Sequence, residues 1–151
     1  MSSSSIYPFK SYQNNNSTSL VNGVDTQLTV YDGSSVLDNY GSLSNYFTES
    51  ATSFTNKSGK ALYCIISYRW GFAGAGNANG TYIQLWLRRS NSAVRYVGNG
   101  FPITTSDVPN ASGSTPIVLA QGESISLWGW QNSGSTISYV IPQFSILVLN
   151  F

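Results

Sequence analysis

The sequence predicts an all-β protein, built as a sandwich or barrel of antiparallel strands. Short extended runs alternate with clusters of Gly, Pro, Asn and Ser, and no window sustains a helical period. Only 9% of the 151 residues are charged, whereas ordinary globular proteins have about 25%. Aromatic residues make up 14% of the chain, and a disordered protein would have few of them. The surface we expect is neutral and rich in hydrogen-bonding groups.

The first 20 residues differ in composition from the rest of the chain. Residues 1–20 are rich in Ser and Asn and predict a flexible N-terminal arm. Residues 6–9 (IYPF) form an aromatic island in this arm, which docks either on a neighbouring molecule or on the domain itself. Residues 21–151 then form a single domain, because no linker or internal repeat interrupts them.

The first half of this domain contains three extended segments. Residues 24–33 alternate between apolar and polar side chains and end in an Asp-Gly turn, and residues 42–59 form a weaker extended stretch. Residues 60–72 form a strong strand, and the glycine-rich residues 74–80 follow it as a loop.

The second half is predicted to contain two hairpins and a terminal strand. The first hairpin covers residues 81–100 and turns at Ser90–Ser92, and residues 101–114 follow it as a long loop. The second hairpin covers residues 115–134 and turns at Gln121-Gly122. An apolar strand over residues 135–151 ends the chain.

Three of the predicted strands carry apolar or aromatic side chains on both faces. The strand at residues 81–89 is close to one-sided, with Ile83, Leu85 and Leu87 facing inward. A strand with two dry faces indicates a sheet between the core and a further layer. The two-faced strands are residues 61–70, 124–131 and 143–151. Because no helix is predicted, the cover that we expect is another copy of the chain.

From about residue 60 to the C-terminus, the sequence resembles the C1q/TNF-like jelly-roll family. The segments that carry the resemblance occur in the family's order: GKALYCIISY, YIQLWLRRSNSAVRYV, LAQGESISLW and QFSILVLNF. The first 55 residues match only loosely. The resemblance implies a two-sheet antiparallel jelly-roll sandwich that assembles as a compact homotrimer. It also implies an inner sheet around the threefold axis, with Phe151 near the base or the interior of the trimer.

The two-faced strands and the resemblance together predict a trimer interface. We expect all three two-faced strands to lie in the inner sheet. In the segment QGESISLWGW, Ile125 and Leu127 fill the sandwich, so Trp128 and Trp130 face a neighbouring subunit. The predicted interface residues are Tyr63, Ile65, Ser126, Trp128, Trp130, Phe144, Ile146 and Val148.

The titratable residues do not form a catalytic pattern. The chain has no histidine, and its six acidic residues are scattered singly, mostly at turns. Its one cysteine, Cys64, excludes an internal disulfide and a cysteine-rich zinc site, and we expect it to be a small buried hydrophobe. No Asp/Asn-rich loop indicates a calcium site. We therefore predict that the protein is not an enzyme and has no cofactor and no catalytic or metal-binding residues.

Charge and hydropathy exclude two further classes of partner. The net charge is +1, and Arg88-Arg89 is the only cluster of basic residues, so we expect no nucleic-acid binding. No segment approaches membrane-spanning length, so we expect no membrane insertion. The first residues lack the apolar core of a secretion signal.

Outward aromatic side chains suggest a carbohydrate site. Tyr82, Trp86 and Tyr96 are expected to face outward, where they can stack on sugar rings while Arg88 donates hydrogen bonds. The alternative, which we favour, is that these aromatic residues pack under a loop or against a neighbour. Arg88 and Arg89 fall on opposite faces of their strand. We expect one of them to form an ion pair that caps an interface, and the other to contribute solubility.

The function that we expect is structural. A trimer-forming jelly roll with an uncharged polar surface and a tethering arm fits a component of a virus or phage particle: a minor capsid protein, a spike or a fibre head. Its partners are then two further copies of itself, other capsid or fibre proteins through residues 1–20, and a cell-surface glycan. The alternatives are a trimeric carbohydrate-binding lectin or receptor-binding head, and a microbial surface or spore-coat domain. We expect the protein on the virion surface, or otherwise outside the cell or on a microbial surface.

Overall fold

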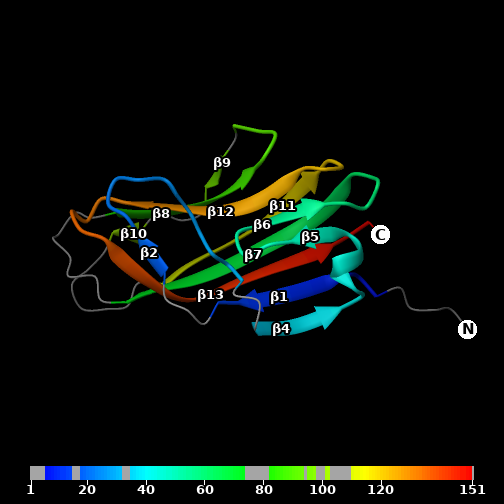
Figure 1. The fold of residues 1–151 in the computed structure, drawn as a ribbon, viewed down its shortest axis with the longest axis horizontal. Helices are drawn as coiled ribbons and strands as arrows, with labels where there is room; N and C mark the ends of the chain where they lie inside the picture. Colours follow the sequence, from blue (N-terminus) through cyan, green and yellow to red (C-terminus); the bar gives the residue numbers. More distant parts are fainter. Residues whose placement is uncertain are drawn as a thin grey trace, which may run out of the picture.

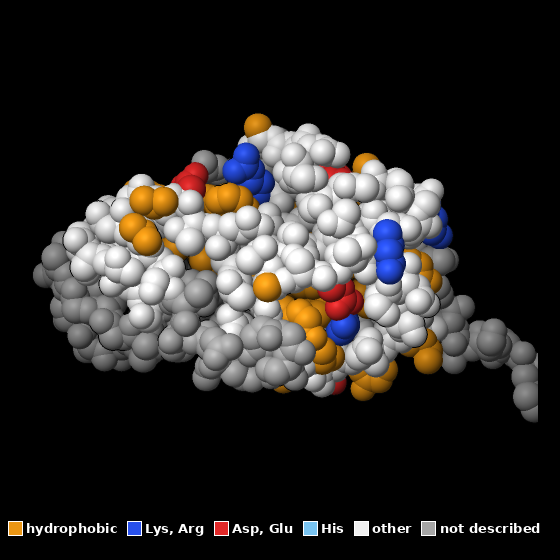
Figure 2. All heavy atoms as spheres, viewed as in Figure 1, with side chains coloured by type: hydrophobic (Ala, Val, Ile, Leu, Met, Phe, Trp, Pro, Cys, Tyr) orange, Lys and Arg blue, Asp and Glu red, His pale blue; other side chains and the backbone are white. Residues whose placement is uncertain are grey.

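The computed structural model describes residues 6–14, 18–31, 35–73, 82–93, 95–97, 101–102 and 110–150. They form two antiparallel sheets, with one 3₁₀ turn at Leu43–Asn45 (Figure 1). The predicted all-β architecture is confirmed. Figure 2 shows few charged side chains on the viewed face, as the 9% of charged residues predicts.

Sheet A contains six strands, and its order is β11, β7, β13, β1 and β4, with β2 paired to β13. In Figure 1, β7, β13, β1 and β4 lie side by side. The strand bounds are β1 Phe9–Gln13, β2 Thr18–Leu20, β4 Ser35–Tyr40, β7 Leu62–Ala73, β11 Asn110–Leu119 and β13 Ile137–Val148.

Sheet B contains seven strands, and its order is β10, β8, β12, β6 and β5, with β3 paired to β12 and β9 paired to β8. The strand bounds are β3 Thr26–Gln27, β5 Phe47–Glu49, β6 Ser53–Asn56, β8 Tyr82–Arg89, β9 Arg95–Val97, β10 Phe101–Pro102 and β12 Ser124–Gln131. The predicted hairpin that turns after Arg89 is confirmed by the pairing of β8 with β9.

The core lies between the two sheets, and aromatic contacts join them. Phe54 of β6 stacks on Phe144 of β13, with ring centroids 5.0 Å apart, and Tyr12 of β1 lies 4.8 Å from Phe54. Ile83, Leu85 and Leu87 are buried, as predicted. The remainder of the core follows from strand alternation, because every second side chain over residues 62–68, 125–127 and 144–148 points into the space between the sheets.

The N-terminal residues include an integral strand, which corrects the expectation of a flexible arm over residues 1–20. Strand β1 pairs with β13 on one side and with β4 on the other. Tyr12 is 0% exposed, and Lys10 forms an ion pair with Glu49 of sheet B, with 2.6 Å between Lys10 Nζ and Glu49 Oε2. Burial of the Tyr12 ring and of the aliphatic part of Lys10 stabilises this strand within the sheet. Residues 1–5 lie outside the described part.

A second correction concerns the three two-faced strands, which do not share one sheet. β7 and β13 are neighbours in sheet A, whereas β12 lies in sheet B between β8 and β6. The predicted hairpin over residues 115–134 is therefore wrong. The turn at Gly122, whose φ is +78°, carries the chain from β11 in sheet A to β12 in sheet B.

The predicted Asp32-Gly33 turn, the glycine-rich loop at 74–80 and Phe151 lie outside the described residues. The predicted loop over residues 101–114 contains strand β10 and the first half of β11, and residues 103–109 between them are not described.

Candidate functional site: the outward faces of the two sheets

The outward face of sheet A carries an apolar row that crosses all five strands of its main path. The strand register places Ile65 opposite Leu147 and Leu147 opposite Phe9. The row is completed at its two ends by Pro116, opposite Ile65, and Tyr40, opposite Phe9. A cross-strand row of this kind puts neighbouring side chains about 5 Å apart on one face.

A second apolar row lies beside the first one. Val118 of β11 is opposite Tyr63 of β7, and the backbone N–H of Leu149 donates to the carbonyl of Tyr63 at 2.8 Å. Tyr63 is 53% exposed, Val118 41% and Leu149 42%. Tyr40, in the first row, is also exposed. We call these two rows together the apolar band of sheet A.

The other half of the same face is polar. The next row in register consists of Ser114, Ser67, Ser145, Ser11 and Asp38. Ser67 Oγ lies 2.8 Å from Ser114 Oγ.

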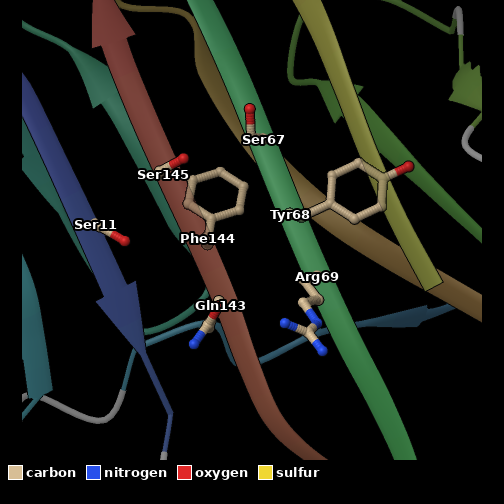
Figure 3. A pocket seen from close by; sticks show the side chains of 7 residues that line it. All are labelled: Ser11, Ser67, Tyr68, Arg69, Gln143, Phe144 and Ser145. Carbon is tan, nitrogen blue, oxygen red and sulfur yellow. The ribbon is translucent and has the colours of Figure 1, made fainter. Parts of the chain in front are cut away.

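Arg69 and Gln143 follow in the row after that, where they are opposite each other. In Figure 3 the side chains of Ser11, Ser145 and Ser67 lie on three adjacent strands, with Gln143 and Arg69 beyond them, and a pocket of about 150 Å³ opens there. The apolar band is thus suited to a contact that excludes water, and the polar half of the face to a contact that retains water.

The structure divides the predicted interface residues among three places. Tyr63 and Ile65 lie in the apolar band. Phe144, Ile146 and Val148 are at most 1% exposed and fill the core of the single chain. The residues that alternate with these three point outward instead: Ser145 and Leu147 in β13, and Leu149 after it. Ser126, Trp128 and Trp130 lie half-buried on the outward face of sheet B.

Sequence reasoning missed Phe9, Tyr40, Pro116, Val118, Leu147 and Leu149 as members of the apolar band. The signal for Leu147 and Leu149 was present, because the strand predicted over residues 143–151 is apolar on both faces. The other four needed the register, which places β1, β4 and β11 beside the two strands that sequence reasoning had identified.

The outward face of sheet B carries a groove of about 380 Å³ beside Trp128. The Arg88 guanidinium lies over the Trp128 ring, 5.2 Å from its centroid. Trp128 Nε1 donates a hydrogen bond to Ser126 Oγ at 2.9 Å. The lining residues are Gln27, Ser53, Arg88, Arg89, Ser90, Ser124, Ser126 and Trp128.

Arg89 forms an ion pair inside the chain, and the predicted ion pair that caps an interface is not tested by it. Its Nε lies 2.7 Å from Oε1 of Glu123, whose side chain is completely buried. The second carboxylate oxygen of Glu123 accepts the backbone N–H of Ala120 at 2.9 Å. The ion pair is internal to the chain, and it joins β8 to the turn before β12.

The predicted carbohydrate contacts do not form one patch. Trp86 is 1% exposed, so its indole offers no face to a ligand. Tyr82 is exposed at the other end of β8 from Arg88. Tyr96 lies opposite Leu87 in β9, and its side chain is outside the described part. Of the four predicted contact residues, Arg88 is the one that lines the groove beside Trp128.

Three further titratable groups, Tyr12, Cys64 and Tyr68, lie in the hydrophobic core. Burial raises the pKa of the Cys64 thiol to about 12, and burial also raises the pKa of Tyr68. Burial, followed by the nearby Glu49 carboxylate, raises the pKa of Tyr12. Within the described ranges, no three His, Cys, Asp or Glu side chains gather as a metal site. A search of the same residues found no helix that is long and apolar enough to cross a membrane.

Comparison with solved structures identifies the fold. The globular domain of zebrafish complement 1qA protein is 16% identical, with a TM-score of 0.59 over 96% of this chain and 98% of that one. PRD1 vertex protein P5 is 15% identical, with a TM-score of 0.58 over 95% and 97% of the two chains. Murine APRIL is 9% identical, with a TM-score of 0.60 over 95% and 100%. No protein-family model and no curated protein matches the sequence.

These similarities establish the fold class of the chain. The chain has a C1q/TNF-like jelly-roll fold, as its resemblance implied, and the similarity extends over the first 55 residues as well as the remainder. At these identities, the similarity shows the fold alone.

Proposed function

We propose that this protein is a structural component of a virus or phage particle and that it assembles as a homotrimer through the outward face of sheet A. The single observation that carries the proposal is the apolar band, which joins five strands in register and whose side chains are partly or fully exposed in the single chain. Large exposed apolar patches mark interaction sites, because each Å² removed from water contributes about 25 cal/mol.

The proposal of three subunits is based on the resemblance to the C1q/TNF-like family. In C1q/TNF-like trimers, one sheet of each subunit packs around the threefold axis, and sheet A is the sheet with the apolar outward face. The polar half of that face supports the same arrangement, since interfaces combine an apolar centre with hydrated polar margins.

The role in a particle is supported by one of the similar structures, PRD1 vertex protein P5, which is named for a place in an assembly. The uncharged polar surface and the chemistry of the described residues also fit a structural role better than catalysis. We place the protein on the virion surface, as a minor capsid protein, a spike or a fibre head.

Replacing Leu147 by Asp tests the interface. Leu147 lies in the middle of the apolar band, so the variant places an unpaired carboxylate in the proposed contact, where its desolvation opposes assembly. Light scattering should give three times the chain mass of 16.3 kDa for the parent protein and the mass of one chain for the variant.

Trp128→Asp is the matched control, since it introduces the same charge at a half-buried aromatic residue on the outward face of sheet B. It should remain trimeric. Tyr63→Lys, at an exposed position of the band, is a second test that does not depend on the folding of Leu147→Asp. A monomeric parent would overturn the proposal. Dissociation by Trp128→Asp but not by the two sheet A variants would instead place the interface on sheet B.

A further inference from the structure

The groove on sheet B has a different chemical character from the apolar band of sheet A. Its walls contain the hydroxyls of Ser53, Ser124 and Ser126, the amide of Gln27 and the guanidinium of Arg88, with Trp128 as its aromatic member. Of the described residues that line it, none is acidic. The groove therefore combines positive charge with closely spaced hydrogen-bonding groups.

The positive charge comes chiefly from Arg88. The ion pairs of the described chain join Lys10 to Glu49 and Arg89 to Glu123, and Arg88 belongs to neither. Its side chain is exposed, so the guanidinium is available to balance the charge of a bound anion.

Stacking on Trp128 holds the guanidinium in position. The indole is anchored by its own hydrogen bond to Ser126 Oγ, and the guanidinium lies 5.2 Å from the ring centroid. A guanidinium that lies over an aromatic ring keeps the N–H groups at its edge available for a carboxylate or sulfate, which it can bind through two hydrogen bonds. Trp128 is thus a positioning residue for Arg88.

The serine hydroxyls and the Gln27 amide give the groove hydrogen-bonding groups in addition to its positive charge. Ser124 Oγ lies 2.7 Å from Thr55 Oγ1, and Gln27 Nε2 donates to the carbonyl of Thr52 at 3.2 Å, so both side chains are held in place. A hydroxyl has one donor and two acceptor positions, and one internal contact leaves capacity for a ligand. Several such groups beside a cation suit a ligand that carries hydroxyls around a single negative charge.

We propose that this groove binds an acidic saccharide, with its carboxylate or sulfate on Arg88 and its hydroxyls on the serines and Gln27. The site differs from the one that the sequence suggested, because Trp86 is buried and Arg88 acts with Trp128 instead. It lies on the other sheet from the proposed trimer interface, so a trimer built on sheet A leaves all three grooves open to solvent.

Calorimetric titration of the full chain tests the proposal with four probes: sialyllactose for a carboxylate, a heparin tetrasaccharide for sulfates, neutral lactose, and sodium sulfate alone. We expect one of the two acidic saccharides to bind at least about tenfold more tightly than lactose and sulfate. Arg88→Gln should reduce that affinity about tenfold or more, and Arg88→Lys should recover only part of it.

Lys60→Gln is the matched control, because it removes one positive charge from an exposed side chain that lines neither the groove nor the apolar band, and it should leave the affinity unchanged. Binding of lactose or free sulfate as tight as that of the acidic saccharide would overturn the assignment. So would the absence of binding to both acidic probes, or equal losses in Arg88→Gln and Lys60→Gln. A glutamate oligopeptide that binds equally well would indicate an acidic peptide as the ligand instead.

Discussion

Cys64 shows how the core controls the chemistry of a single residue. The thiol lies on the inward face of β7, is 1% exposed, and has a pKa raised by burial from 9.0 to about 12. The structure confirms the expectation of a small buried hydrophobe. At neutral pH the buried side chain is the neutral thiol, which is a poor nucleophile and a poor metal ligand.

The raised pKa of Cys64 predicts a pH dependence of stability. Above pH 9 the unfolded chain loses the thiol proton while the folded chain retains it, so the free energy of unfolding falls as the pH rises toward 12. Between pH 8 and pH 10, the ionisation of this thiol in the unfolded chain should lower the free energy of unfolding by about 1 kcal/mol.

Urea unfolding of the parent and of Cys64→Ala at both pH values measures the effect. The parent should lose more stability than the variant by that amount, and the variant supplies the correction for all other titrating groups. Tyr12 and Tyr68, whose pKa values are also raised by burial, contribute with the same sign at still higher pH. Equal pH dependence in the two proteins would show that the thiol is accessible to water.

At the scale of elements, the turn between β11 and β12 is fixed by side chains that lie far from it in sequence. The amide of Asn56 donates to the carbonyls of Leu119 and Ala120 at 2.9 and 3.1 Å. Glu123 accepts from Ala120 and from Arg89. The left-handed Gly122 then starts β12 in the other sheet. The segment LAQGESISL, which carries much of the family resemblance, thus encodes a crossover between sheets.

Glu123→Gln tests the ion pair at this crossover. The variant removes the Glu123 carboxylate from the Arg89 guanidinium, but the Arg89 side chain is 26% exposed, so water compensates part of the loss. We expect the free energy of unfolding to fall by about 2 kcal/mol, measured by denaturant titration. Arg89→Gln and the double variant complete a thermodynamic cycle. A coupling energy near zero would mean that the two charges act independently.

Strand alternation predicted the faces within each strand but could not assign the strands to sheets. The inward positions of Ile83, Leu85 and Leu87 followed from period-two patterning. In β12 the same pattern placed Trp128 outward, which is right, but gave no information on whether β12 neighbours β7 or β8. In β13 both faces are apolar, and the choice of Phe144 over Leu147 for the interface depended on packing that only the folded chain defines.

The sequence also could not predict which side chains are buried by contacts between distant segments. Trp86 follows the outward alternation of β8 and is nevertheless buried, with Trp128 on one side and Val97 of β9 on the other in the register. Residues 9–13 lie in a Ser/Asn-rich region, and their place between β13 and β4 depends on pairing with strands that are distant in sequence. Local composition describes neither effect.

At the scale of the whole molecule, the two sheets present outward faces of opposite character. Sheet A carries an apolar band beside a polar half, and sheet B carries a basic, hydroxyl-rich groove. A trimer that covers the first face exposes the second one three times. In the proposed trimer, the three grooves would bind together to a surface that displays the same saccharide. Their avidity would then be well above the affinity of each single groove.

The proposed trimer also predicts that thermal stability depends on protein concentration. When folding and association are coupled, a tenfold increase in concentration stabilises each chain of a trimer by about 0.9 kcal/mol, which is two thirds of the free energy of a tenfold change. For a chain of 151 residues, this raises Tm by about 2–4 °C. Calorimetry of the parent at 10 and 100 μM measures the shift, and Trp128→Asp should show it as well. Leu147→Asp should unfold at the same temperature at both concentrations, because a monomer gains nothing from mass action. A parent whose Tm does not change with concentration would contradict the coupling of folding to assembly.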